Sequence, residues 1–180
     1  MILETPRLSL RCLTDRDYPA LCRVMLQDPE VMYAYAHAFS DEEAWEWLHR
    51  QQVRYREDGF GLWAVLLRAT GQLIGQCGVT WQEVRGRRVP EVGYLLGKEF
   101  WGRGYAIEAA RACKEYAFDT LGFDQVYSII RDSNLASQRV AIRNGMLPRD
   151  RIIKPYYHQE MPHVVFSVRA REDGGKGNRL

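Results

Sequence analysis

Hydrophobic residues follow two different periods along this chain of 180 residues. Short apolar and β-branched runs between turn residues predict strands at 8–11, 62–67, 73–81, 89–96, 125–130 and 164–168. Apolar residues spaced three and four apart predict helices over about 15–27, 41–56, 104–121 and 135–143. The expected order, β-α-α-β-β-β-α-β-α-β-β, includes one more strand before 164–168. This order predicts a mixed sheet with helices on both sides.

We expect a single domain over residues 1–170, because no linker or internal repeat interrupts the alternation of elements. Residues 171–180 (REDGGKGNRL) are expected to be a disordered tail, since three glycines and five charged residues offer nothing to bury.

Composition excludes several classes of protein. The chain carries 25 Lys and Arg against 23 Asp and Glu, a net charge of +2, which is too balanced for a dedicated nucleic-acid binder. No apolar run approaches the roughly 18 residues of a membrane span, and the first residues lack the layout of a secretion signal. The four cysteines form no CxxC pair and the four histidines no HExxH motif. We therefore expect a cytoplasmic protein with reduced thiols and no metal.

The segment from Glu91 to Ala109 leads from a predicted strand through a glycine-rich turn into the longest predicted helix. Gly102 and Gly104 let the backbone approach a ligand closely, and the unpaired N–H groups at a helix start favour an anion. Arg103 adds a positive charge. The turn therefore predicts a phosphate site, although it does not say which cofactor binds there.

Three interpretations compete for this turn. A dinucleotide-binding fingerprint would need a small residue where Ile107 stands, and it would lie in the first strand–helix unit of the chain. A P-loop is excluded because its GxxxxGK pattern is absent. A turn that only joins a strand to a helix is the second interpretation. Glu108, in the first turn of that helix, is expected on its solvent-exposed face.

The third interpretation is a resemblance to the GNAT superfamily of N-acetyltransferases. Its pyrophosphate motif, Gln/Arg-x-x-Gly-x-Gly/Ala, is similar to residues 101–106 (WGRGYA), where Trp101 replaces the usual Gln or Arg. An aromatic-Gly-basic-Gly-Tyr-Ala run is frequent in the RimJ/RimL-like ribosomal-protein N-terminal acetyltransferases. Residues 4–11 (ETPRLSLR) also resemble the first strand of that branch. Residues 134–146 resemble the second family motif, with Met146 in place of the usual Phe. The resemblance extends over about residues 3–168.

The resemblance implies a mixed α/β (α+β) GNAT-like fold with a mostly antiparallel sheet of about seven strands and about four helices. It implies acetyl-CoA as cosubstrate, no metal, and direct transfer of the acetyl group to a primary amine. The strands at 89–96 and 125–130 are expected to splay apart and admit the pantetheine arm. The implied cofactor-binding residues are Trp101, Gly102, Arg103, Gly104, Tyr105, Ala106, Ile107 and Asn134.

Glu91 is the leading candidate for the general base, because a Glu-x-Gly-Tyr pattern in this strand is common in the branch that the chain resembles. If Trp81 and Tyr94 surround its carboxyl group, its pKa rises toward the useful range. The alternatives are a strand glutamate paired with Arg87 or Arg88, and a relay of water molecules in place of a base.

Ser137 is the best candidate for giving a proton to the departing thiolate, with Asn134 orienting the cofactor. Many superfamily members place a tyrosine where this chain has Ala141. Tyr127 and Tyr105 are weaker substitutes for that missing acid. The alternative for Ser137 is a serine that only begins a helix.

The acceptor is expected near the N-terminal helices and the aromatic loop 33–40. Trp45, Trp47 and Trp63 would line a groove there or belong to the core. Residues 15–58 carry ten acidic against five basic residues, whereas residues 131–154 carry six basic against two acidic. This asymmetry favours an anionic cofactor at the basic part and a cationic acceptor, including a basic protein N-terminus, at the acidic part.

Within the resemblance, a protein N-terminal amine of the ribosomal-protein type is the first candidate acceptor, and a small-molecule amine or antibiotic is the second. A non-catalytic acetyl-CoA-binding module is the alternative from another class. No direct binding to nucleic acid or membrane is expected, and the fold is compatible with a monomer or a homodimer.

Overall fold

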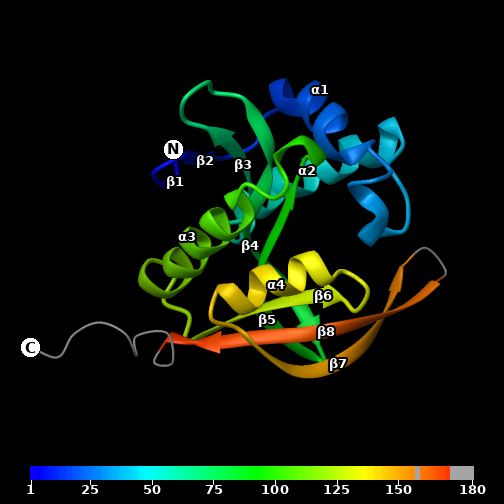
Figure 1. Ribbon diagram of the computed structural model, residues 1–180, viewed down its shortest axis with the longest axis vertical. Helices are drawn as coiled ribbons and strands as arrows, with labels where there is room; N and C mark the ends of the chain where they lie inside the picture. Colours follow the sequence, from blue (N-terminus) through cyan, green and yellow to red (C-terminus); the bar gives the residue numbers. More distant parts are fainter. Residues whose placement is uncertain (157–158, 171–180) are drawn as a thin grey trace, which may run out of the picture.

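One mixed sheet runs through the molecule. The computed structural model describes residues 1–156 and 159–170. The tail predicted at 171–180 lies outside the described residues. Within the described part, the strands are β1 (Leu3–Glu4), β2 (Leu8–Arg11), β3 (Leu62–Leu67), β4 (Leu73–Val84), β5 (Arg87–Leu96), β6 (Gln125–Arg131), β7 (Leu147–Tyr156) and β8 (Gln159–Arg169). The α-helices are α1 (Tyr18–Leu21), α2 (Asp41–Glu57), α3 (Tyr105–Asp119) and α4 (Leu135–Arg143) (Figure 1).

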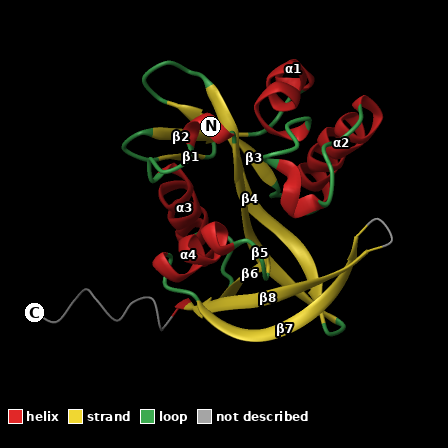
Figure 2. Cartoon of the chain, turned by 45° about the vertical axis from the view of Figure 1, so that its right-hand side comes forward, coloured by secondary structure: helices red, strands yellow, loops and turns green. Residues whose placement is uncertain are grey.

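The strands are ordered β1-β2-β3-β4-β5-β6-β8-β7 across the sheet. Every neighbouring pair is antiparallel except β5 and β6, which run parallel. Helices α3 and α4 lie on one side of the sheet, and α1 and α2 lie on the other (Figure 2). The mixed α/β, mostly antiparallel sheet with helices on both faces is therefore confirmed.

Two clusters of buried side chains hold these layers together. The larger cluster packs α3 on the sheet through small residues, of which Ala109, Ala110, Cys113 and Ala117 are fully buried. The second cluster packs α1 and α2 on the opposite face through Leu21, Ala44 and Leu48. The small side chains of α3 let its backbone come close to the strands, as their spacing predicts.

The helix predicted over 15–27 is the main difference in the first half of the chain. A 3₁₀ turn (Asp15–Asp17), the short α1 and a π-helical turn (Cys22–Leu26) together cover that segment. Pro19 stands in the first turn of α1 and has no N–H group, so one continuous α-helical ladder cannot run through it. The sequence pattern predicts which face of this segment is buried, but it does not predict that the segment is divided into three kinds of helical turn.

The last two strands are longer than their hydrophobic pattern predicts. The expected strand 164–168 is only the buried part of β8, which begins at Gln159. Its partner β7 is an edge strand that alternates exposed and half-buried residues and carries charges and prolines. Such a composition protects a sheet edge from pairing with other chains, but it weakens the strand signal in the sequence.

Candidate active site

Strands β5 and β6 diverge from each other soon after they meet. They share one pair in register, Glu91 opposite Tyr127, and no further pair follows within the described residues. Side chains take the place of the missing ladder, since the N–H of Ile129 donates to Glu91 Oε1 at 2.9 Å and Ser128 Oγ donates to the Val92 carbonyl at 2.7 Å. The predicted splay is therefore present, and its start is held by side chains.

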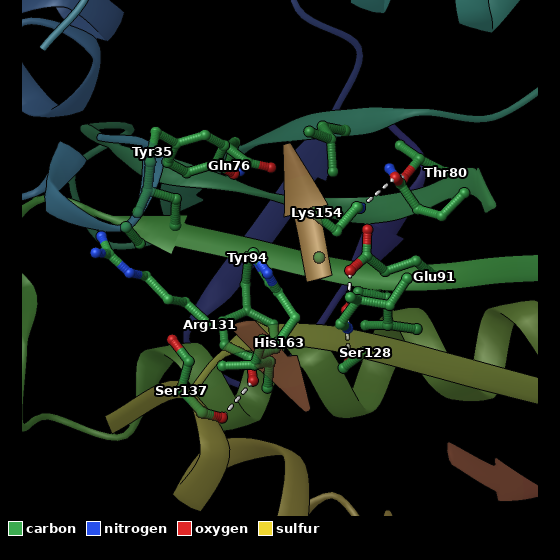
Figure 3. Close-up of a pocket in the computed structure, with 18 of the residues that line it drawn as sticks. Tyr35, Gln76, Thr80, Glu91, Tyr94, Ser128, Arg131, Ser137, Lys154 and His163 are labelled. Carbon is green, nitrogen blue, oxygen red and sulfur yellow. Dashed lines mark hydrogen bonds between the residues drawn. The ribbon is translucent and has the colours of Figure 1, made fainter. Parts of the chain in front are cut away.

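A cavity of about 460 Å³ opens at this divergence (Figure 3). It is lined by Glu91 from β5 and by Asn134 and Ser137 from the start of α4. These are the three residues predicted to act in catalysis, and the fold brings them to one cavity. Among the described residues that line it, none comes from 101–107, so the predicted phosphate site lies outside this cavity.

The environment of Glu91 agrees with the prediction in part, since its pKa is raised and Tyr94 lines the same cavity. Burial raises the pKa of its carboxyl group, while Lys154, the Ile129 N–H and Arg54 act in the opposite direction. Trp81 plays no part in this, because it lies opposite Pro90 in the sheet and packs with Phe60 and Phe123 at 5.8 and 5.2 Å.

The alternative for Glu91, an ion pair with Arg87 or Arg88, is absent within the described part of the chain. Arg88 instead donates to Asp58 at 2.9 Å and lies over the ring of Trp81 at 4.5 Å. Glu91 is therefore a half-buried carboxyl group that faces Lys154 and Arg54 without an ion pair to either. This arrangement suits a group that must gain and lose a proton.

Asn134 and Ser137 fix the start of α4 against the sheet. Asn134 Oδ1 accepts the N–H of Ser137 at 3.1 Å and so caps the helix. The Tyr94 hydroxyl donates to the Ser137 carbonyl at 2.7 Å, which ties α4 to β5. Ala141 is buried in the core, and neither Tyr127 nor Tyr105 lines the cavity.

The glycine turn before α3 has the geometry of an anion site. Gly102 and Gly104 have φ angles of 73° and 79°, in the left-handed region that favours glycine. A Cβ at Gly102 would meet nothing within 4 Å, so the turn is open to a ligand. The first hydrogen bond of α3 runs from the Glu108 N–H to the Gly104 carbonyl at 3.2 Å, and the N–H groups of residues 105–107 precede it. These donors fit a diphosphate group.

The N-terminal segment holds this turn in place through Glu108. The carboxylate of Glu108 accepts from Thr5 Oγ1 at 2.6 Å, from the Arg7 N–H at 2.9 Å and from Arg7 Nε at 2.6 Å. Arg7 also donates to the Arg103 carbonyl at 2.9 Å and lies over the Tyr105 ring at 4.5 Å. The prediction that Glu108 faces solvent is wrong, because residues far apart in sequence cover it.

Trp101 closes the turn from the other end. It is 45% exposed, and its indole N–H donates to the Leu96 carbonyl at 2.8 Å, at the end of β5. The residue that replaces the usual Gln or Arg therefore attaches the turn to the strand that carries Glu91. Arg103 is exposed beside the glycines, and the Ile107 side chain is buried.

The part of the cavity that faces α2 contains some of the predicted aromatic residues. Tyr35, Phe39 and Trp47 line it. Trp63 belongs to the core, and Trp45 stacks on Tyr18 with ring centroids 3.9 Å apart, so neither of these two takes part.

The charge of this lining is opposite to the predicted one. Segment 15–58 contributes no carboxylate to the described lining but does contribute Arg50 and Arg54. The spacing of these arginines on α2 could have revealed their common face. Lys154 and His163 also line the cavity. Lys154 lies in β7, for which the sequence pattern predicted no bounds, and His163 lies one residue before the predicted strand 164–168.

The described residues contain neither a membrane-spanning helix nor a metal-binding cluster. No helix there is long and apolar enough to cross a membrane. No group of three or more His, Cys, Asp or Glu there could hold a metal ion.

Comparison with known proteins places the chain among acetyltransferases. The family model "Acetyltransferase (GNAT) domain" matches residues 7–147. The uncharacterized protein YkkB of Bacillus subtilis (strain 168) is 38% identical over 144 residues, which cover 80% of this chain and 84% of YkkB. The structure of an acetyltransferase from Agrobacterium tumefaciens str. C58 matches with a TM-score of 0.77 at 30% identity, and the match covers 92% of each chain.

RimL, a ribosomal-protein α-N-acetyltransferase solved with coenzyme A, shares the fold at a TM-score of 0.78 and 17% identity, over 96% of this chain and 99% of RimL. The divergent strands, the open glycine turn and the family match lead to one conclusion. The chain belongs to the GNAT acetyltransferase family and is an acyltransferase that uses acetyl-CoA as its cosubstrate.

Proposed function

We propose that the protein transfers the acetyl group of acetyl-CoA directly to a primary amine, with Glu91 as the general base. The observation that carries this proposal is the position of Glu91, at the point where β5 and β6 diverge and in one cavity with Ser137. Because burial raises the pKa of this carboxyl group, its proton affinity moves toward the range in which a base is effective near neutral pH.

Acetyl-CoA, when bound, supplies the activated acetyl thioester. Glu91 takes the proton of the amine while the nitrogen–carbon bond forms and the carbon–sulfur bond breaks. The Ser137 hydroxyl gives its proton to the leaving thiolate while it takes one from water, and Glu91 then returns the proton of the amine to solvent, so that both groups regain their starting states. Asn134 positions Ser137 through the cap of α4.

The proposed cofactor site joins the turn and the cavity. The backbone N–H groups of Gly102, Arg103, Gly104, Tyr105, Ala106 and Ile107 are the proposed donors to the diphosphate, and Arg103 adds its charge. Trp101 and Asn134 shape the two ends of the site through their bonds to Leu96 and Ser137.

The cysteines support direct transfer rather than an acetylated enzyme. Cys77 and Cys113 are fully buried, and their sulfur atoms face each other at 3.5 Å between β4 and α3. Burial raises the pKa of the Cys113 thiol well above its usual value, so a thiolate nucleophile is disfavoured there.

For the acceptor we propose first the N-terminal amine of a peptide or protein, as in the RimJ/RimL-like branch, and second a small-molecule amine. The likeness to RimL, which acts on a ribosomal protein, supports the first class. An α-amine has a pKa near 8, whereas a lysine amine has one near 10.4, so the α-amine is more easily deprotonated by a carboxylate or a water relay. We further propose a cytoplasmic location and a monomer or homodimer.

The test is the substitution Glu91→Gln, with coenzyme A release followed over a panel of peptides and amines. We expect kcat to fall by about 10² to 10³ and its dependence on pH to change, while the affinity for acetyl-CoA measured by calorimetry stays within about twofold. Glu115→Gln, on the exposed side of α3, is the matched control. An unchanged pH profile in Glu91→Gln would remove Glu91 as the base and leave a water relay.

A further inference from the structure

The acceptor side of the cavity carries an excess of positive charge. Arg50 and Arg54 reach it from α2, Arg131 from the end of β6, and Lys154 from β7. Glu91 is the one carboxylate among the described residues of the lining. Figure 3 shows Glu91 and Lys154 close to each other, with Arg131 on the side nearer Tyr35.

Two of these cations have partners that account for their positions. Arg131 donates to the Tyr33 carbonyl at 2.8 Å, and Lys154 donates to Gln82 Oε1 at 3.2 Å. Arg54 differs, because it donates to the neutral Gln51 Oε1 at 3.0 Å and forms no ion pair within the described chain.

Arg54 is also in an unfavourable environment for a charge. Its side chain is half-buried, and burial followed by the charge of Arg50 lowers the pKa of its guanidinium. A partly desolvated guanidinium beside a second one is stabilised by an anion that both can contact, and the planar fork of arginine matches a carboxylate. The charges of Asp58 and Glu91 act in the opposite direction on this pKa, but neither carboxylate forms an ion pair with Arg54 within the described residues, and Asp58 is paired with Arg88.

One buried polar atom in the same cavity has no hydrogen-bond partner among the described residues. This atom is Oε1 of Gln76, which lies on β4 and is 1% exposed. It points to the same side of the sheet as Thr80, which lies opposite Glu91, and Figure 3 shows it beside Tyr35. A buried, unpaired amide oxygen costs free energy unless a ligand donates an N–H or O–H group to it.

We propose that the amine acceptor carries a carboxylate, which Arg54 binds together with Arg50, and a hydrogen-bond donor for Gln76. This rests on the function proposed above and specifies its acceptor. An amino acid and the N-terminus of a peptide with an acidic residue near its amine both have this chemistry. The amine lies toward Glu91 and the carboxylate toward α2, so the acceptor spans the cavity between them.

The test compares acceptors that differ only in the carboxylate. L-leucine is compared with L-leucinamide, a peptide beginning Ser-Asp with one beginning Ser-Asn, and spermidine serves as a cationic acceptor. We expect kcat/KM for at least one carboxylate member to exceed that of its amide partner by about tenfold or more, and spermidine to be poor. A preference for the amides or for spermidine overturns the proposal.

Variants of Arg54 test whether this residue causes the preference for a carboxylate. Arg54→Gln should bring the ratio of kcat/KM for the carboxylate member to that for its amide partner close to one, while Arg54→Lys should restore part of that ratio. Because the two acceptors are compared within one variant, any effect of Arg54 on Glu91 is common to both and cancels in the ratio. Arg56→Gln, exposed on the same helix and outside the cavity lining, should change neither acceptor. A carboxylate preference that survives in Arg54→Gln overturns the assignment.

Binding separates this proposal from the proposed function. Stabilisation of the protein by each acceptor is measured as a thermal shift in the presence of coenzyme A, without turnover. If carboxylates stabilise the parent but not Arg54→Gln, and no acceptor releases coenzyme A from acetyl-CoA, then the anion site stands and the transferase proposal fails. If neither member of any pair stabilises the protein, the anion site is refuted whatever the turnover.

Discussion

Removing the carboxylate of Glu108 should destabilise the protein, although this residue is remote from the cavity. Three hydrogen bonds end on this one side chain, from the Thr5 hydroxyl, the Arg7 N–H and the Arg7 guanidinium. Glu108 is 15% exposed, whereas Arg7 is 47% exposed. Glu108→Ala therefore leaves the Arg7 N–H without its acceptor and leaves the Thr5 hydroxyl with only its longer bond of 3.3 Å to the Leu8 carbonyl. It also leaves a guanidinium that water can reach.

The size of the effect follows from these exposures. Each of the two covered hydrogen bonds contributes about 1 kcal/mol, and the ion pair adds a few tenths at most because Arg7 is half-exposed. We expect a loss of about 2 kcal/mol, or a fall in Tm of roughly 4 to 8 °C for a chain of this size. Glu108→Gln keeps an oxygen for Thr5 and the Arg7 N–H, so it should cost under about 1 kcal/mol.

The assay is thermal unfolding at several pH values, with Glu115→Ala as the exposed control on the same helix. Burial would raise the pKa of Glu108, but hydrogen bonds from Thr5 and Arg7 outweigh it and the pKa is lowered. The stabilisation is therefore present above the unfolded pKa of about 4.3 and is lost as pH falls through the folded pKa. A Tm of Glu108→Ala within 1 °C of the parent at pH 7 would refute a stabilising role for these hydrogen bonds.

Two further predictions concern another ion pair and the glycine turn. Asp17→Asn breaks the paired bonds of 2.7 and 2.8 Å with Arg11 and should cost about 2 kcal/mol at pH 7 in urea unfolding. Burial raises the pKa of Asp17, but bonds from Arg11 lower it overall, so the difference should shrink as pH falls below about 3.9. Gly104→Ala should weaken acetyl-CoA binding about fivefold or more in calorimetry, because φ of 79° costs a side chain about 1 to 2 kcal/mol and the turn relaxes away from the conformation that binds. Gly122→Ala, with φ of 72° after α3, should lose stability but keep its affinity, and equal affinities in both variants would contradict the turn as the binding site.

Strong local periodicity made much of the fold predictable. The strand at 62–67 and the helix at 135–143 have the predicted bounds, and α2 begins at the predicted residue 41, where Ser40 and Glu43 form a capping box. Prediction failed where tertiary contacts or backbone chemistry override the pattern. Pro19 divides the first helical segment, and the edge strand β7 has no continuous apolar face.

Prediction of the site divides along similar lines. The candidates Glu91, Asn134 and Ser137 could be chosen from the motifs that resemble those of the family, and the fold brings all three to one cavity. The acceptor lining could not be predicted, since net charge along a segment does not say which side chains face inward. Arg54 is such a case, because it points into the cavity from the most acidic part of the chain.

The divergence of β5 and β6 has a consequence for how the molecule unfolds. Along the facing edges of β5 and β6, one paired position and two side-chain hydrogen bonds join the block β1 to β5 to the block β6, β8 and β7. Amide protons along the two inner edges should exchange with solvent faster than those elsewhere in the sheet. A cosubstrate that bridges both edges would couple the blocks into one cooperative unit, and at a hundred times its Kd it would add about 2.7 kcal/mol to the free energy of unfolding. Bound acetyl-CoA would thus stabilise the sheet in addition to serving as a reactant.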